Sequence, residues 1–222
     1  MRAFTRFSYS HSIQRMAALM PQTISLRKKP LQARSAFTVQ AILDAAARVL
    51  AQDSLSGFNT NRVAEVAGVS VGSLYQYFPN KDALTAALIA YEQDRLAQAV
   101  ESCAAAGRDV SLRKALTLLV QIAIEHQWGN PRYAAALDHE EKRLPVSEQL
   151  QTIQVRLVQA VVQLLRRHLL PLPEHKLLQL AKDCVVICKA LVEAESADAL
   201  QQALRGRVLD WLMHRLQAHQ AA

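Results

Sequence analysis

The sequence predicts an all-α protein, with an N-terminal three-helix domain followed by a larger helical domain. Apolar residues recur at helical spacing, as at Ile42, Ala46, Val49 and Leu50. That i, i+4, i+7, i+8 pattern is typical of one buried helix face. The 222 residues include only six glycines, and we find no convincing run of strands and no internal repeat. The fold class therefore follows from periodicity and from the residues that interrupt it.

The elements follow from the N-terminus in order. The striped first helix ends near Asp53, before Ser56-Gly57. Two short helices and a long one then follow, at residues 61–67, 71–77 and about 80–105. Helix breaks at glycine, proline and asparagine separate the remaining stretches. These predict helices at about 110–127, 131–142, 147–169, 174–194 and 198–219.

The stretch from Phe58 to Lys81 predicts two helices joined by a tight turn. Thr60 is placed to cap the first helix through its hydroxyl. Gly68 follows the end of that helix, where a left-handed residue is often required. Val69 is an apolar plug in the turn, and Ser70 caps the second helix. This pattern is typical of a helix-turn-helix that binds DNA.

The second short helix has an inner and an outer face. Leu74 and Phe78, at i and i+4, point into a core. The outer faces carry Ser73, Tyr75, Gln76 and Tyr77. Their hydroxyls, phenols and amide suit hydrogen bonds to phosphates and base edges. Gly72 costs this helix about 1 kcal/mol relative to alanine, and close approach to a phosphate or base edge is a candidate reason for keeping it.

Two other interpretations of the stretch compete with this one. Residues 68–72 match G-x-S-x-G, the nucleophile elbow of α/β-hydrolases, which would make Ser70 a nucleophile. That elbow requires a strand before it, whereas residues 61–67 predict a helix. The other alternative is a helical hairpin that binds no ligand, which would have little reason to expose Ser73, Tyr75 and Tyr77 together.

The segment Gly68-Val69-Ser70-Val71-Gly72-Ser73-Leu74-Tyr75-Gln76-Tyr77-Phe78-Pro79-Asn80-Lys81-Asp82-Ala83-Leu84 resembles the recognition region of tetracycline-repressor-like (TetR family) transcriptional regulators. Residues 41–46 resemble the first helix of their DNA-binding domain, so the resemblance covers about residues 35–91. It implies a repressor that binds a palindromic operator as a homodimer and is released by a small-molecule effector. The expected DNA-facing residues are Thr60, Arg62, Ser70, Val71, Gly72, Ser73, Tyr75, Gln76, Tyr77 and Lys81. Family members often carry lysine where this chain has Val71, so the operator sequence does not carry over.

Charge agrees with a DNA-binding N-terminal region. The chain has a net charge of +7, and residues 1–91 hold ten lysines and arginines against four acids. Positive charge near the helix-turn-helix suits phosphate binding. A basic surface also suits an acidic protein or a membrane surface, which leaves a helical interaction module as the alternative function.

Three domains are expected: residues 1–34 as a disordered basic extension, 35–91 as the helix-turn-helix domain and 92–222 as the effector-binding and dimerisation domain. Met20-Pro21 is a plausible alternative start. Arg27, Lys28, Lys29 and Arg34 are placed to form an arm that adds phosphate or minor-groove contacts.

The C-terminal region carries two further predictions. Two apolar-striped helices suit either a core within the chain or a bundle with a second copy, and the resemblance favours the homodimer. The candidate dimer residues are Leu180, Cys184, Cys188, Leu191, Leu204, Val208, Trp211 and Leu212. The effector-pocket candidates, polar and aromatic residues around the break at 129–131, are His126, Trp128, Tyr133, Asp138 and His139. An apolar or aromatic effector is weakly favoured.

Chemistry elsewhere in the chain is sparse. Cys184 and Cys188 lie one turn apart but lack a nearby third ligand, so no metal is expected, and neither is a cofactor. No carboxylate pair or phosphate-binding loop predicts an enzyme. No stretch is long enough to span a bilayer, and the three cysteines do not predict a disulfide framework, so a cytoplasmic location is expected.

Overall fold

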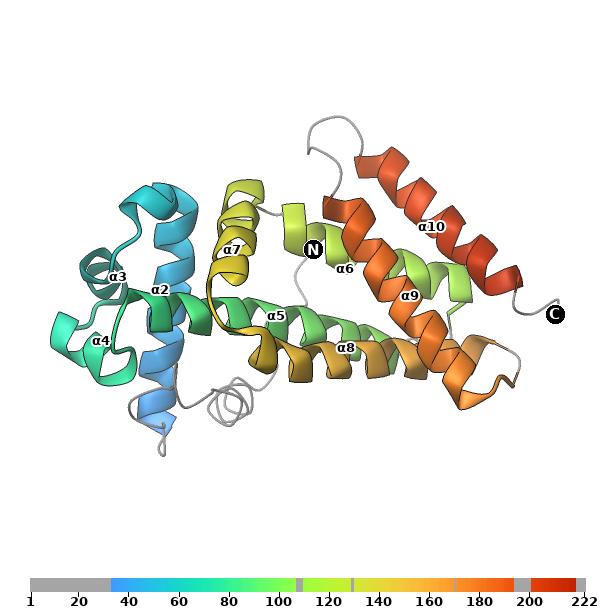
Figure 1. The fold of residues 1–222 in the computed structure, drawn as a ribbon, viewed down its shortest axis with the longest axis horizontal. Coiled ribbons are helices and arrows are strands. Elements are labelled where there is room, and N and C mark those ends of the chain that lie inside the picture. Colours follow the sequence, from blue (N-terminus) through green and yellow to red (C-terminus); the bar gives the residue numbers. More distant parts are fainter. Residues whose placement is uncertain (1–32, 107–109, 129, 170, 194–200, 219–222) are drawn as a thin grey trace. The chain divides into compact units, whose positions relative to one another are not determined.

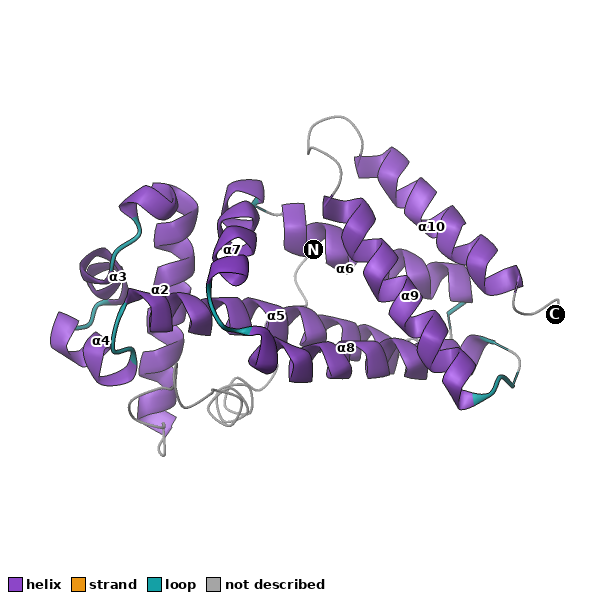
Figure 2. Cartoon of the chain, viewed as in Figure 1, coloured by secondary structure: helices purple, strands orange, loops and turns teal. Residues whose placement is uncertain are grey.

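The computed structural model describes residues 33–106, 110–128, 130–169, 171–193 and 201–218, and every regular element within these ranges is an α-helix. Figure 2 shows these helices in purple, with the described loops and turns in teal. Their bounds are α2 Ala33–Gly57, α3 Thr60–Ala67, α4 Val71–Tyr77, α5 Lys81–Ala106, α6 Leu112–Trp128, α7 Pro131–Arg143, α8 Ser147–His168, α9 Glu174–Glu193 and α10 Gln201–Ala218. The all-α prediction is confirmed. In the described residues, no helix is long and apolar enough to cross a membrane.

The chain divides into two compact units. The first comprises residues up to Asp94 together with Arg132–Thr152, and the second comprises Arg95–Pro131 and Ile153–Ala222. The predicted boundary near residue 91 lies close to the division within α5. The segment 132–152 was expected in the C-terminal domain, whereas it packs with the N-terminal helices. Most of the predicted extension at 1–34 lies outside the described residues, and α2 begins at Ala33.

The first unit is built on one apolar core. Helices α2, α3 and α4, visible in Figure 1, surround the beginning of α5. Ala136 and Leu137 of α7 pack into the same core, as do Leu144 and Val146 after it. The largest fully buried side chains in this unit are Phe58, Phe78, Ile42, Leu43, Leu50, Leu74, Leu84, Leu88 and Ile89.

A polar network joins α2 to α5 inside the first unit. The Gln40 amide donates to the Tyr91 hydroxyl at 2.6 Å and to Asp44 at 2.9 Å, and the Tyr91 hydroxyl donates to Asp44 at 3.3 Å. Gln40 is buried. Because buried polar groups are costly without partners, this network fixes the register of α2 against α5.

Helix α2 has a sharp kink at Ser54, three residues before its end at Gly57. Ser54 has φ 57° and ψ −176°, a conformation that interrupts the helix and costs a residue with a side chain about 1–3 kcal/mol. The Phe58 amide then donates to the Ser54 carbonyl at 3.1 Å, and Phe58 is buried in the core. The turn therefore delivers Asn59 directly to the start of α3.

The second unit has its own apolar core. Helices α6, α9 and α10 pack against one another, and the C-terminal part of α5 and most of α8 contribute to the same core. Arg156 of α8 binds Glu101 of α5 at 2.9 Å, and Arg215 of α10 binds Asp183 of α9 at 3.1 Å.

Candidate nucleic-acid interface

The turn between α3 and α4 is formed by local backbone chemistry. Gly68 caps α3 in the left-handed conformation, with φ 68° and ψ 30°. Its N–H donates to the Glu65 carbonyl at 3.1 Å, and the Val69 N–H donates to the Ala64 carbonyl at 3.0 Å. These bonds satisfy the end of the helix, and glycine adopts the conformation without steric cost. The predicted C-cap is confirmed.

Ser70 begins α4 as its N-cap. Its hydroxyl oxygen accepts from the Ser73 N–H at 3.0 Å. The two hydroxyl oxygens of Ser70 and Ser73 also lie 2.8 Å apart. The capped helix spans Val71–Tyr77, the predicted bounds. Since α3 precedes Gly68, the strand that a hydrolase elbow needs does not occur there.

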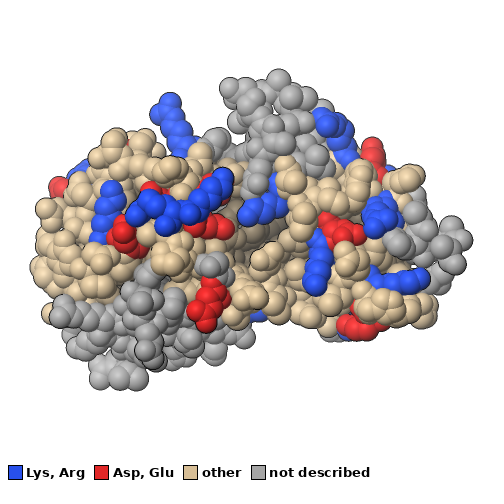
Figure 3. Space-filling view, in the orientation of Figure 1, with Lys and Arg blue, Asp and Glu red and all other residues tan. Residues whose placement is uncertain are grey.

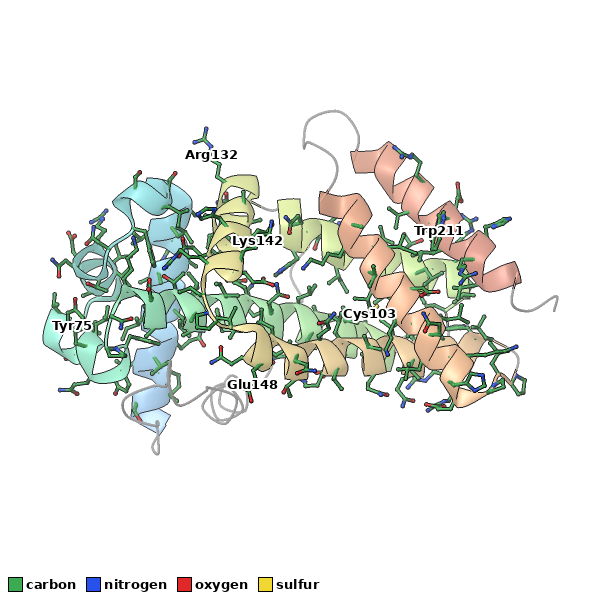
Figure 4. The ribbon with its side chains drawn as sticks, viewed as in Figure 1. Tyr75, Cys103, Arg132, Lys142, Glu148 and Trp211 are labelled. Carbon is green, nitrogen blue, oxygen red and sulfur yellow. The ribbon has the colours of Figure 1, made fainter. Side chains whose placement is uncertain are left out.

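Helix α4 buries one face and exposes the other. Leu74 is fully buried, as is Phe78 just after the helix, which confirms their predicted orientation. Val71 is 37% exposed and Tyr75 is 38% exposed, and Figure 4 shows Tyr75 on α4. Gly72 and Gln76 are exposed as well. We call these four residues the α4 face: Val71, Gly72, Tyr75 and Gln76.

Thr60 takes a different position from the one expected. The N-cap of α3 is Asn59, whose side chain accepts from the Arg62 N–H at 2.9 Å. Thr60 is the first helical residue and is buried, and its hydroxyl oxygen lies 3.0 Å from that of Tyr75. The cap assignment was wrong by one residue, because Asn59 and Thr60 are both good caps and only the backbone decides between them.

The charged candidates are already paired within the chain. Arg62 forms ion pairs with Glu65 at 2.8 Å and with Asp53 at 3.7 Å. The hydrogen bond to Glu65 is the main cause that raises the Arg62 pKa. The Lys81 ammonium lies 5.5 Å from the centre of the Phe58 ring, within range of a cation–π interaction. Arg62 therefore has less freedom to reach a phosphate than its sequence position predicts.

Two other predicted contact residues are only partly available. Tyr77 is half-buried and packs against the first core. Ser73 is also half-buried. In Figure 3, basic and acidic side chains are interleaved on this side of the molecule.

The effector-pocket candidates do not form one set within either unit. His126 and Trp128 belong to the second unit, whereas Tyr133, Asp138 and His139 belong to the first. The Tyr133 hydroxyl donates to Glu92 at 2.9 Å, and His139 is exposed. The Trp128 side chain lies outside the described part of the structure. Proximity in sequence around a break is a weak guide here, because the division between units runs through that break.

Four of the candidate dimer residues are instead buried in the core of the second unit. These are Leu180, Cys184, Val208 and Leu212. Cys188 packs against the same core, and Trp211 is 41% exposed. The side chains of Leu191 and Leu204 are not described. An apolar stripe identifies a buried face but not whether the same chain or a second copy covers it.

The two cysteines of α9 are protected by their surroundings. Burial raises the pKa of Cys184 to about 12 and that of Cys188 to about 11. The thiolate is the form that binds metals and reacts as a nucleophile. Both thiols therefore remain protonated near neutral pH.

One feature of the first unit was not predicted from the sequence. Arg143, the last residue of α7, binds Asp82 in the first turn of α5 at 2.6 Å and Glu140 at 2.6 Å. The hydrogen bond from Arg143 is the main cause that lowers the Asp82 pKa. This contact joins α7 to the helix that directly follows the α4 face. Its partners lie 61 residues apart, so no local pattern signals it.

The helical fold and the capped turn between α3 and α4 together define a protein of the helix-turn-helix class. Residues 42–88 match the family model "Bacterial regulatory proteins, tetR family". The helix-turn-helix-type transcriptional regulator YuxN of Bacillus subtilis is 24% identical over 124 residues, which are 55% of this chain and 41% of YuxN. The chain thus matches about two fifths of the length of that curated relative.

Solved structures extend the likeness over most of the chain. A TetR-family transcriptional regulator from Streptomyces coelicolor has a TM-score of 0.65 at 22% identity, covering 83% of this chain and 98% of that one. FadR of Bacillus subtilis, solved with stearoyl-CoA, has a TM-score of 0.57 at 19% identity, covering 78% and 96%. Residues 42–88 thus match the TetR family, as the recognition region predicted, and the solved structures share the fold of the larger part of the chain.

Proposed function

We propose that this protein is a DNA-binding transcriptional repressor that binds a two-fold symmetric operator as a homodimer and is released by a small-molecule effector. The observation that carries the proposal is the α4 face. It combines an exposed aliphatic side chain, a glycine, a phenol and an amide on a helix that is fixed by two caps and a buried leucine. A helix held in this way can enter the major groove as a rigid element.

Each residue of the α4 face has a distinct expected role. Gln76 has the donor and acceptor pair that reads an adenine edge, and Val71 suits a thymine methyl. Tyr75 suits a phosphate oxygen, because its hydroxyl donates a single hydrogen bond. Gly72 permits close approach of the backbone. Operator preference then depends mainly on Val71 and Gln76, and affinity on the phosphate contacts.

The homodimer is proposed to form through the outer faces of α9 and α10. Val186 of α9 is 59% exposed and Trp211 of α10 is 41% exposed, so both apolar side chains are open to a partner surface. Figure 4 shows Trp211 on α10. Trp211 belongs to the predicted set, whereas Val186 is added in place of the members that are buried. A two-fold dimer presents two α4 faces and so reads two half-sites.

Release is proposed to be a population shift between two spacings of the α4 faces. An effector that binds one state better than the other shifts the balance by its difference in affinity. The contact between Arg143 and Asp82 links α7 to the start of α5, which directly follows α4. Movement of α7 would therefore displace the start of α5 and the helix before it. That FadR of this fold was solved with stearoyl-CoA supports an effector with a large apolar part.

Salt-dependent binding to random-sequence duplex DNA tests the basic proposal. We expect affinity to fall steeply between about 50 and 200 mM salt, because binding releases counterions from the phosphates. The double substitution Tyr75→Phe and Lys81→Ala should weaken binding and flatten the salt slope. The exposed Gln154→Ala on α8 is the control and should change neither.

Two outcomes would overturn the proposal. One is binding to anionic lipid vesicles, or to an acidic protein, with no binding to duplex DNA. That result would favour a helical interaction module. The other is DNA binding that the double substitution leaves unchanged, which would remove the α4 face from the interface.

A further inference from the structure

The geometry points to Thr60 as a positioning residue that orients Tyr75 for a phosphate and makes no DNA contact of its own. The inference rests on the proposed function. Thr60 is buried at 8% exposure, whereas Tyr75 is 38% exposed on the α4 face. Their hydroxyl oxygens lie 3.0 Å apart, and 15 residues separate them in sequence. Thr60 therefore contacts the side chain that is placed to reach DNA, from the buried side.

Counting hydrogen atoms fixes the direction of this contact on DNA. Each hydroxyl has one hydrogen to donate and lone pairs to accept. A phosphodiester oxygen only accepts. If the Tyr75 hydroxyl donates to a phosphate, its oxygen is left to accept from the Thr60 hydroxyl. The hydrogen bonds then run from Thr60 to Tyr75 and from Tyr75 to the phosphate. Hydrogen bonds in such a chain polarise and strengthen one another.

The surrounding structure holds Thr60 firmly in place. It is the first residue of α3, immediately after the Asn59 cap, whose side chain binds the Arg62 N–H. Buried Val63, one turn further on, anchors the helix in the core. Tyr75 by contrast lies on the exposed side of α4 and is 38% exposed. Because Thr60 holds the Tyr75 side chain in one orientation before DNA is bound, less conformational entropy is lost on binding.

A double-substitution cycle tests the inference. The probe is a duplex recovered by selection from random DNA, and affinity is measured by fluorescence anisotropy. Thr60→Val keeps the shape and removes the hydroxyl, and Thr60→Ser keeps the hydroxyl. We expect Thr60→Val to weaken DNA binding about two- to tenfold for each of the two helix-turn-helix domains of the dimer, which is the cost of one ordinary hydrogen bond. Thr60→Ser should bind like the parent.

The decisive comparison is made in the Tyr75→Phe protein. There Thr60→Val should change affinity no further, because the residue it orients has lost its hydroxyl. An equal loss of affinity in both backgrounds would overturn the inference, since Thr60 would then act independently of Tyr75. Thermal unfolding of each variant separates a loss of fold from a loss of contact. Failure of the parent to bind any duplex would instead refute the proposed function.

Discussion

Replacing Gly72 by alanine should move stability and DNA affinity in opposite directions. Gly72 is the second residue of α4 and is exposed. A Cβ built there would meet nothing closer than the Ser70 hydroxyl oxygen at 3.9 Å, an ordinary contact distance. Its φ is not positive. Nothing in the folded chain therefore requires glycine at this position.

The size of both effects follows from that geometry. Alanine in place of a helical glycine gains up to about 1 kcal/mol, less in a first turn. For a chain of this length, about 1 kcal/mol raises the melting temperature by about 2–4 °C. If the added methyl group blocks one close DNA contact worth about 1 kcal/mol in each subunit, the dimer loses about 2 kcal/mol of binding free energy, which is about thirtyfold in affinity.

Differential scanning fluorimetry and DNA-binding titrations measure the two effects. The matched control is Gly206→Ala in α10, where an added Cβ meets nothing within 4 Å. It should gain stability in the same way and leave DNA affinity unchanged. The reasoning would be refuted if Gly72→Ala bound DNA as tightly as the parent while melting at the same or a higher temperature.

Three other predictions concern stability and assembly. The Arg143 hydrogen bond lowers the pKa of Asp82 below its ordinary 3.8, so the stability that this contact contributes is present above that pH and is lost as the pH falls through the lowered value. The difference in unfolding free energy between the parent and Arg143→Met should therefore shrink below about pH 4. A difference that does not depend on pH would contradict this prediction. Val186→Glu should give a monomer in sedimentation, whereas Val155→Glu, with a similar exposure of 56% against 59%, should remain dimeric; a dimer in both would reject the proposed interface. Gln149 is buried with neither amide atom hydrogen-bonded, so Gln149→Met should raise the unfolding free energy by about 1–3 kcal/mol, and a fall would show that the amide has a partner.

Local sequence signals allowed the helix-turn-helix, α3 and α4, to be predicted closely. The bounds of α4 follow from Gly68 and Ser70, because a left-handed cap and a hydroxyl cap each act within a few residues. The cap of α3 was harder to predict. Asn59 and Thr60 are adjacent and chemically alike in this role, so the choice depended on the backbone, which is extended at Asn59 with φ −146° and ψ 157°.

Long-range packing limited the rest of the prediction. The stripe containing Leu180 and Cys184 was recognised, but its partner is the chain's own core. The segment 132–152 joins the first unit through Leu137, Val146 and the Arg143 network. Those contacts span many residues of sequence, and no periodic pattern encodes which unit a helix joins.

Selection of bound sequences from random duplex DNA tests the central claim most directly, because it measures recognition by the α4 face without assuming an operator. We predict enrichment of a two-fold symmetric sequence whose half-sites are centred about 34–36 Å apart, one turn of the duplex. The Gln76→Ala protein should then select a less restricted half-site. Recovery of no enriched sequence, or of one without symmetry that Gln76→Ala selects equally well, would contradict the account.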